Sequence, residues 1–189
     1  MALKPLSIEG AWVHTPEILS DSRGLFFESF KESELRHSDI PFQVKQTNVS
    51  VSKLGVIRGI HWADSPPGQA KFVSCHMGSI IDVVVDLRAG SVTFGNWDSR
   101  LLNSSNRESV LIESGLGHAF IALEDNTLVS YLCSEEYSPT TERSINPLDK
   151  TIDIDWAMLG GKTSFSMSER DRNAPSLKEL LKLGLLPTL

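Results

Sequence analysis

The sequence predicts a mainly β protein that folds as a sandwich or a barrel. Short runs of β-branched and apolar residues recur along the chain, and clusters of glycine, asparagine and aspartate that are typical of turns separate them. Many short strands joined by such turns favour a sandwich or a barrel. With 189 residues, the chain has the length of one domain, residues 1–189, and can bury one sizeable core.

The clearest strand patterns lie in residues 79–87, 109–113, 118–123 and 127–134. The first of these segments is apolar and β-branched at both odd and even positions, which is typical of a strand buried on both faces of its sheet. Side chains alternate along a strand, so Asp82 shares a face with Ile80 and Val84. Because an unpaired buried carboxylate is costly, we expect Asp82 to pair with another group.

Two short helices are expected at the periphery. One lies near residues 31–36, and the other spans about residues 176–183. In the second helix, Ser176 and Glu179 have the spacing of a capping box, which satisfies the first backbone N–H groups. Gly184 is a natural stop for this helix, because glycine accepts the left-handed conformation of a C-cap.

Composition limits the possible partners and compartments. The net charge of −6 argues against nucleic acid as a partner, although local cationic side chains can still bind a small anion. No apolar run approaches the ~20 residues of a membrane span, and the N-terminus lacks an apolar signal core. We therefore expect a cytoplasmic protein without a membrane partner. Cys75 and Cys133 lie in apolar runs and are expected to be reduced core residues.

Polar residues are concentrated between positions 46 and 71, among apolar residues that favour burial. A buried polar group costs free energy unless it is paired, so this concentration predicts a pocket for a polar, anionic ligand. The residues concerned are Gln46, Asn48, Arg58, His61 and Lys71, and a lone histidine, His118, follows later in the chain.

Arg58 and His61 have opposite strand parity, so a regular strand would point them to opposite faces of its sheet. Both side chains can face one pocket only if the strand is irregular between them. Gly59 is the position where a bulge costs least, and we predict an irregularity there.

The candidate residues suit proton transfer next to a carbonyl group. Histidine titrates near neutral pH and commonly needs a carboxylate on its second nitrogen, for which Asp82, Asp86 and Asp171 are candidates. Lys71 could stabilise a negative oxygen, and a buried Tyr131 could act as an acid. Taken singly, each candidate also has an ordinary structural role, as a hydrogen-bonded histidine, a core aromatic or a solvated lysine.

The histidine spacing disfavours a metal site. Barrel proteins that hold a catalytic metal often use two histidines one residue apart, and no His-x-His sequence occurs here. His61 and His118 supply two ligands, where a catalytic zinc-like site takes three from the protein. We therefore expect metal-independent chemistry without a cofactor.

A set of ordered segments resembles a known family. Its clearest members are Gln46-Thr-Asn48, Gly55-Val-Ile-Arg-Gly-Ile-His61, Pro67-Gly-Gln-Ala-Lys71, Gly78-Ser-Ile-Ile-Asp-Val-Val-Val-Asp-Leu-Arg88, Gly115-Leu-Gly-His-Ala-Phe120 and Ser168-Glu-Arg-Asp171. In this order, and across most of the chain, they resemble the dTDP-4-dehydrorhamnose 3,5-epimerases of the cupin superfamily. The resemblance implies a cupin-type antiparallel β-barrel or jelly roll with a few short peripheral helices.

The resemblance also implies a role for each matching residue. It makes His61 the general base and Asp171 the carboxylate that pairs with it. Lys71 then stabilises the enolate oxygen, and Tyr131 is the acid on the opposite face of the sugar. A second histidine–aspartate pair, His118 and Asp82, lines the site.

Further positions match substrate contacts of the family, and Phe26 and Tyr137 match the aromatics expected against the thymine ring. In the family, residues near Arg23 and Glu28 reach the site of the neighbouring subunit, so a homodimer with shared active sites is implied. The complete set of substrate-binding positions is Arg23, Phe26, Glu28, Gln46, Asn48, Arg58, Tyr137, Glu142 and Arg170.

By this resemblance, the protein inverts carbons 3 and 5 of dTDP-4-dehydro-6-deoxy-D-glucose, a dTDP-4-keto-6-deoxyhexose, to give dTDP-4-dehydro-L-rhamnose. One alternative is an epimerase of carbon 3 only, or of carbon 5 only, from an antibiotic deoxysugar pathway. A second is a cupin that binds a nucleotide sugar without turnover, which the complete set of His61, Lys71, Tyr131 and Asp171 disfavours. A third, a metal-dependent cupin oxygenase, is disfavoured by the missing His-x-His.

Overall fold

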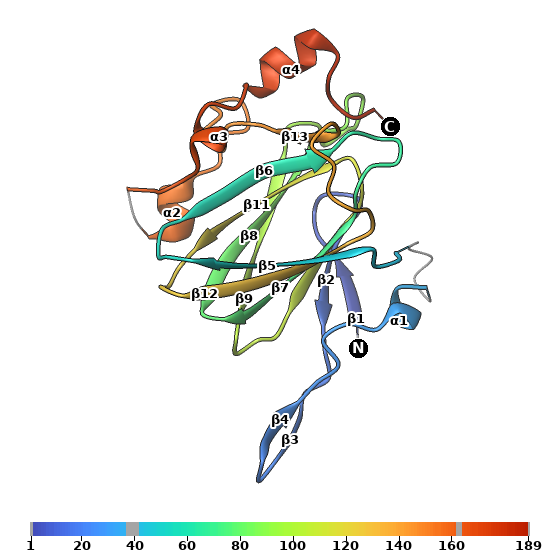
Figure 1. The fold of residues 1–189 in the computed structure, drawn as a ribbon, viewed down its shortest axis with the longest axis vertical. Helices are drawn as coiled ribbons and strands as arrows, with labels where there is room; N and C mark the ends of the chain where they lie inside the picture. The colour runs from blue at the N-terminus through green and yellow to red at the C-terminus, as the bar shows by residue number, and fades with distance from the viewer. Residues whose placement is uncertain (1, 37–41, 162–163, 189) are drawn as a thin grey trace.

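Antiparallel sheets form the body of the protein in the computed structural model, which describes residues 2–36, 42–161 and 164–188 (Figure 1). Within these ranges, one sheet has six strands in the order β1 (Ala2–Pro5), β2 (Ala11–Thr15), β10 (Ser109–Ile112), β7 (Lys71–Met77), β12 (Thr127–Cys133) and β5 (Gln46–Ser52). The facing sheet has five described strands in the order β13 (Glu142–Ser144), β6 (Ile57–Ala63), β11 (Leu116–Ala122), β8 (Ser79–Asp86) and β9 (Trp97–Asn103). The mainly β class predicted from the sequence is confirmed.

The faces that the two sheets turn toward each other are apolar and form one core. Val73 of β7 and Val129 of β12 are buried there against Val84 of β8 and Phe120 of β11. Burying apolar surface stabilises this contact by roughly 25 cal/mol per Å².

The same alternation of side chains brings polar groups into this interior. Lys71 shares a face with Val73, and Tyr131 shares one with Val129. On the facing sheet, Asp82 lies two residues from Val84, and His118 lies two residues from Phe120. The interior is therefore lined by apolar side chains along most of its length, and it carries ionisable side chains where these four positions meet.

The predicted strands agree with the observed ones to within one or two residues at each boundary. Segments 79–87, 109–113 and 127–134 correspond to β8, β10 and β12. The segment predicted at 118–123 begins earlier, at Leu116, because Gly117 is part of the ladder with β8. An added Cβ at Gly117 would lie 2.6 Å from a side-chain carbon of Ile60, so this glycine permits close packing rather than a turn.

The outer face of the five-stranded sheet is covered by the C-terminal part of the chain. Val83 and Val85 of β8 pack there against Trp156 of α2 (Trp156–Gly160) and against Leu177 of α4 (Leu177–Leu183). This cover explains why residues 79–87 are apolar at both parities.

The predicted helices near 31–36 and 176–183 are confirmed as α1 (Glu32–Arg36) and α4. α4 has the predicted capping box of Ser176 and Glu179, and Gly184 is its left-handed C-cap. Neither α2 nor α3 (Glu169–Arg172) was predicted, since each is too short for a helical repeat of apolar residues. In the described ranges, no helix is long and apolar enough to span a membrane.

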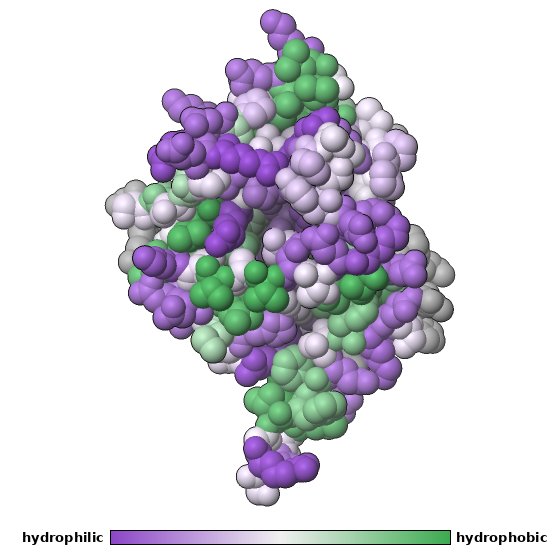
Figure 2. Space-filling view, in the orientation of Figure 1, coloured by the Kyte–Doolittle hydropathy of each residue, from purple (hydrophilic) through white to green (hydrophobic). Residues whose placement is uncertain are grey.

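A hairpin of β3 (Leu19–Asp21) and β4 (Gly24–Phe26) projects away from the body (Figure 1). Its apolar side chains are exposed, and Figure 2 shows hydrophobic surface along the projection with hydrophilic residues at its tip. Phe26, for example, is 64% exposed. The hairpin therefore makes no contribution to the core between the two sheets.

Asp86, at the end of β8, organises the loop that follows it. Its carboxylate accepts hydrogen bonds from the Arg88 guanidinium (2.9 Å), from Ser91 Oγ (2.6 Å) and from Thr93 Oγ1 (2.6 Å). Burial alone would raise the pKa of Asp86, but the bonds from Arg88, Ser91 and Thr93 outweigh it and lower the pKa to about 2. Asp86 is therefore a structural carboxylate and not a partner of a histidine.

Replacing Asp86 should destabilise the fold, most clearly near neutral pH. Because its pKa is lower in the folded than in the unfolded protein, its contribution is present above about pH 4 and is lost as the pH falls toward 2. Asp86→Asn leaves the Arg88 cation without its charged partner, and we expect a loss of about 3 kcal/mol in the free energy of unfolding at pH 7. Denaturant unfolding at pH 7 and pH 3 measures this loss. Glu17→Gln, at an exposed carboxylate, is the control, and equal stability of the two variants at pH 7 would contradict the assignment.

Candidate active site

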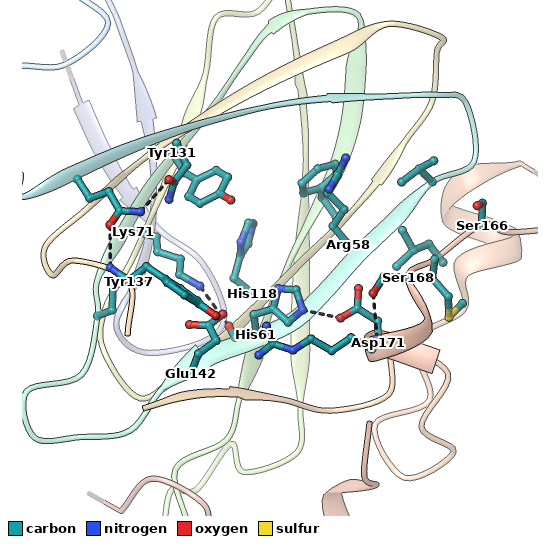
Figure 3. Close-up of a pocket in the computed structure, with 18 residues that line it drawn as sticks. Arg58, His61, Lys71, His118, Tyr131, Tyr137, Glu142, Ser166, Ser168 and Asp171 are labelled. Atoms are coloured by element: carbon teal, nitrogen blue, oxygen red, sulfur yellow. Dashed lines mark hydrogen bonds and ion pairs between the residues drawn. The ribbon is translucent and has the colours of Figure 1, made fainter. Parts of the chain in front are cut away.

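A cavity of about 720 Å³ lies where β5, β7 and β12 face β6, β11 and β13, and the segment around α3 closes one side (Figure 3). The cavity is open to solvent, and both polar and apolar side chains line it. The lining residues are Gln46, Asn48, Val56, Ile57, Arg58, His61, Gln69, Lys71, His118, Phe120, Tyr131, Tyr137, Glu142, Ser166, Met167, Ser168, Arg170 and Asp171.

The predicted irregularity at Gly59 is confirmed. In the pairing of β6 with β11, His61 lies opposite His118 but Arg58 lies opposite Phe120, so the register shifts between these pairs. Gly59 has a φ of +120°, and an added Cβ would come within 2.5 Å of His118 O. The bulge lets Arg58 and His61 line the same cavity despite their opposite parity.

The C-terminal segment carries Asp171 to His61. Ser166 bonds to the start of β6, where the Ile57 N–H donates to its carbonyl (2.8 Å). Ser168 then caps α3 by accepting the Asp171 N–H (3.0 Å). The Asp171 side chain, in turn, lies 2.6 Å from His61 Nε2 through its Oδ1.

The charge of Asp171 determines which nitrogen of His61 can act as a base. Burial raises the pKa of the Asp171 carboxyl, but hydrogen bonding to the His61 and Ser168 side chains, together with the positive charge of a protonated His61 and of Arg170, outweighs burial and lowers the pKa. An ionised carboxylate can only accept hydrogen bonds, so His61 Nε2 carries the proton. In the neutral imidazole, Nδ1 then has a free lone pair for a ligand.

His118 is held in the same way by a carboxylate from the neighbouring strand. Its Nε2 lies 2.9 and 2.8 Å from the two oxygens of Asp82, and both residues are buried. The expectation that Asp82 pairs with another group is confirmed. Burial raises the pKa of Asp82, and the charge of His118 opposes this rise.

Lys71 is buried in the cavity wall, with 6% of its surface exposed, so the solvated role is wrong. Its Nζ donates to His61 O (3.4 Å). Burial lowers the pKa of Lys71, and the negative charge of Glu142 opposes this shift most, followed by that of Asp82. In its protonated form, this buried lysine beside His61 can act on a negative oxygen of a ligand.

Tyr131 reaches the cavity from the sheet that faces His61. It lies on β12, whereas His61 lies on β6, and Figure 3 shows the ring pointing into the cavity. Burial raises the pKa of Tyr131, with Cys133 and Glu142 adding to the shift and Arg58 opposing it. The phenol is therefore protonated at neutral pH and can donate a proton.

Most of the expected substrate-binding positions lie in this cavity, namely Gln46, Asn48, Arg58, Tyr137, Glu142 and Arg170. Arg58 is exposed, and it donates from Nε to Ser52 Oγ (3.0 Å) and from Nη2 to Val51 O (3.4 Å), which leaves Nη1 for a ligand. Arg58 and Arg170 make part of the lining cationic although the whole chain has a net charge of −6.

Arg23, Phe26 and Glu28 are not in this cavity. Arg23 forms an ion pair with Asp21 at the tip of the hairpin (2.6 Å), and Glu28 forms one with Lys31 (2.9 Å). Phe26 lies on the projecting hairpin, so it does not meet Tyr137 within one chain. Within one chain, these three positions therefore contribute nothing to the cavity.

Several lining residues were not predicted, because they are apolar or come from segments without a strand pattern. They are Val56, Ile57, Gln69, Phe120, Ser166, Met167 and Ser168. Ser168 had a usable signal, since serine three residues before Asp171 has the spacing of a helix N-cap. In the described ranges, no group of three or more histidine, cysteine or acidic side chains is placed to hold a metal ion.

The fold and the cavity together define a cupin-type protein whose interior is built around histidine–carboxylate pairs. Residues 5–179 match the family model described as dTDP-4-dehydrorhamnose 3,5-epimerase. The chain belongs to this family, and it is thus an isomerase that epimerises carbohydrates.

Relatives named as 3,5-epimerases and a relative named as a 3-epimerase have similar sequence identity to this chain. The dTDP-4-dehydrorhamnose 3,5-epimerase of Mycobacterium tuberculosis is 48% identical, over 99% of this chain and 93% of its own. The dTDP-4-dehydrorhamnose 3-epimerase of Streptomyces niveus is 43% identical, over 100% of this chain and 89% of its own.

Solved structures confirm the cupin-type fold. The rmlC epimerase of Mycobacterium tuberculosis has a TM-score of 0.95 and 46% identity, covering 100% of this chain and 94% of that chain. ChmJ, a 3′-monoepimerase from Streptomyces bikiniensis in complex with dTDP-quinovose, has a TM-score of 0.92 and 46% identity, covering 97% of this chain and 92% of that chain.

Gly59→Ala should damage the fold and the cavity together. The new methyl group meets Ala119 and His118 O at 2.5 Å, so strand β11 must move in addition to the strain at positive φ. We expect a loss of about 4 kcal/mol in the free energy of unfolding. Gly24→Ala separates the two effects, because Gly24 also has a positive φ (+130°) but has nothing within 4 Å of its added Cβ. Equal losses in both variants would show that close approach at Gly59 is unimportant.

Proposed function

We propose that this protein is a metal-independent epimerase that inverts carbons 3 and 5 of dTDP-4-dehydro-6-deoxy-D-glucose to give dTDP-4-dehydro-L-rhamnose. One observation carries the proposal. His61, oriented by Asp171, and the protonated Tyr131 reach one cavity from facing sheets, with the Lys71 ammonium group beside His61. An inversion needs a base and an acid on opposite faces of one carbon, and this arrangement supplies both.

The proposed reaction begins at a proton next to the 4-keto group. That carbonyl acidifies the protons on carbons 3 and 5, because the electron pair left behind moves onto its oxygen. His61 Nδ1 takes the proton, and Asp171 stabilises the imidazolium that forms. Lys71 stabilises the negative enolate oxygen.

Tyr131 then completes the inversion by donating its proton to the opposite face of the same carbon. The carbon–hydrogen bond on that face forms as the enolate returns to the ketone. His61 loses its proton to solvent and the Tyr131 phenolate regains one, so both groups are ready for the second centre. Hydrogen isotope from the solvent is thereby built into each inverted carbon.

The cationic residues that line the cavity suit the diphosphate of such a substrate. A guanidinium fork matches the geometry of phosphate oxygens, so we propose Arg58 and Arg170 as contacts for the diphosphate. Tyr137 is half-exposed at the cavity and would stack on the thymine ring. We propose His118, Asp82, Gln46, Asn48 and Glu142 as further groups around the sugar and nucleotide.

A homodimer would explain why Arg23, Phe26 and Glu28 lie outside the cavity of their own chain. We propose that the β3–β4 hairpin of one chain reaches the cavity of a second copy and brings Arg23, Phe26 and Glu28 to it. The exposed apolar side chains of the hairpin support a buried role of this kind, since such surface gains stability when it is covered.

An epimerase of carbon 3 only is the second candidate. A relative named as a 3-epimerase is 43% identical to this chain, against 48% for one named as a 3,5-epimerase. These values are too similar for identity to favour either reaction, so the number of inverted centres must be measured.

Proton NMR of dTDP-4-keto-6-deoxyglucose in D₂O with this protein should distinguish the candidates. We expect deuterium exchange and inversion at carbons 3 and 5, since each abstracted proton is replaced from solvent. Exchange at carbon 3 alone would make the protein a 3-epimerase. Absence of exchange at both carbons, with dTDP still bound, would contradict the proposed catalysis and favour a nucleotide-sugar-binding protein.

Two single variants should separate catalysis from binding. His61→Ala should slow the exchange by about 1000-fold, because a general base is lost, while dTDP affinity changes little. Arg58→Ala should weaken dTDP binding by about 30-fold, through loss of a charge-assisted contact, with a smaller effect on the exchange of bound substrate.

Exchange rates by NMR and dTDP affinity by calorimetry measure the two effects. His76→Ala is the control, because His76 bonds to Ser130 outside the cavity. Full exchange in His61→Ala would remove this residue from the base role. Unchanged affinity in Arg58→Ala would place the diphosphate elsewhere.

A further inference from the structure

A series of hydrogen bonds runs along one wall of the cavity and ends at a buried thiol. The Tyr137 N–H donates to Gln46 Oε1 (2.7 Å), and Gln46 Nε2 donates to Asn48 Oδ1 (2.8 Å). Asn48 Nδ2 then donates to Cys133 Sγ (3.7 Å). We propose that Cys133 is a positioning residue whose sulfur anchors this relay, from Cys133 through Asn48 and Gln46, and thereby holds Tyr137 at the cavity.

The direction of the relay follows from its first member. A backbone N–H can only donate, so Gln46 must turn its oxygen to Tyr137 and its NH₂ group to Asn48. Asn48 must then accept through Oδ1, which leaves its NH₂ group facing Cys133. The last residue of the relay is thus required to accept, and the sulfur of Cys133 stands in that position.

The sheet places these residues together. β5 and β12 are neighbours, and Cys133 lies opposite Gln46 in their pairing. Cys133 is fully buried and does not line the cavity, so it can influence a ligand only through other residues. Burial raises the pKa of its thiol, which is therefore neutral.

The backbone position of Tyr137 depends on its hydrogen bond to Gln46, whereas the residues just before it are held by other contacts. Ser134 accepts the Ala70 N–H (2.8 Å), and Glu135 O accepts from Gln69 Nε2 (2.8 Å), so the loop is fixed there by other contacts. The backbone of Tyr137 itself is joined to the sheet through Gln46. One N–H of each amide in the relay also remains for a ligand, so a correctly turned Gln46 and Asn48 serve binding as well.

Hydrogen exchange tests the relay without any ligand. In Cys133→Val the acceptor is lost at similar volume, and we expect the Tyr137 amide to exchange about five-fold faster than in the wild-type protein. Cys133→Ser keeps an acceptor and should restore slow exchange. Cys75→Val is the matched control, because Cys75 is a buried cysteine on β7 that bonds to Met77 O. Should Cys133→Val not fold, Cys133→Ala replaces it, since a smaller side chain cannot overpack the site.

The consequence for binding rests on the proposed function and is measured with dTDP. We expect Cys133→Val to weaken dTDP affinity and raise KM by about five-fold, with kcat within about two-fold of wild type, since the base is untouched. If the relay acts through Tyr137, the loss should disappear in the background of Tyr137→Ala.

The outcomes separate the two proposals. Unchanged exchange of the Tyr137 amide in a folded Cys133→Val protein would overturn the relay. Faster exchange with unchanged dTDP affinity would overturn its role in binding. A wild-type protein that does not bind dTDP would contradict the proposed function, whereas the exchange experiment would still decide whether Cys133 anchors Tyr137.

Discussion

The close approach of β6 and β11 at Gly59 is the constraint on which the cavity depends. A side chain at this position would collide with His118 O and Ala119, so only glycine lets the strands pack while the register shifts. The shift reverses the parity of β6 within three residues. As a result, an arginine suited to phosphate and a histidine suited to proton transfer face the same space, although their spacing in a regular strand would separate them.

Burying charged groups around the cavity costs free energy, and pairing them with opposite charges offsets this cost. Asp171 and Asp82 would each be expensive as isolated buried carboxylates, and each is held by a histidine. The pairs also fix both imidazole rings before any ligand arrives, so little reorganisation is needed in a reaction. Lys71 lies near Glu142 and Asp82, whose charges oppose the effect of burial on its pKa.

The C-terminal part of the chain links stability to the cavity. Trp156 and Leu177 cover the outer face of the five-stranded sheet, and residues 164–171 lie along β6 and place Asp171 against His61. The same stretch of chain therefore closes the core and completes a histidine–carboxylate pair. A change that loosens this cover should disturb the cavity even where no lining residue is altered.

The sequence by itself determined the strand periodicity, the capping box of α4, the bulge at Gly59 and the need for a partner at Asp82, because each follows from local sterics or from the cost of burying charge. Tertiary structure decided which groups meet. His61 and Asp171 are 110 positions apart, and their contact depends on the path of a segment without a repeating pattern. The separation of Arg23, Phe26 and Glu28 from the cavity likewise depends on where the hairpin points. Local preferences act over a few residues, whereas these distances are set only when the sheets pack and the C-terminal segment folds back over them.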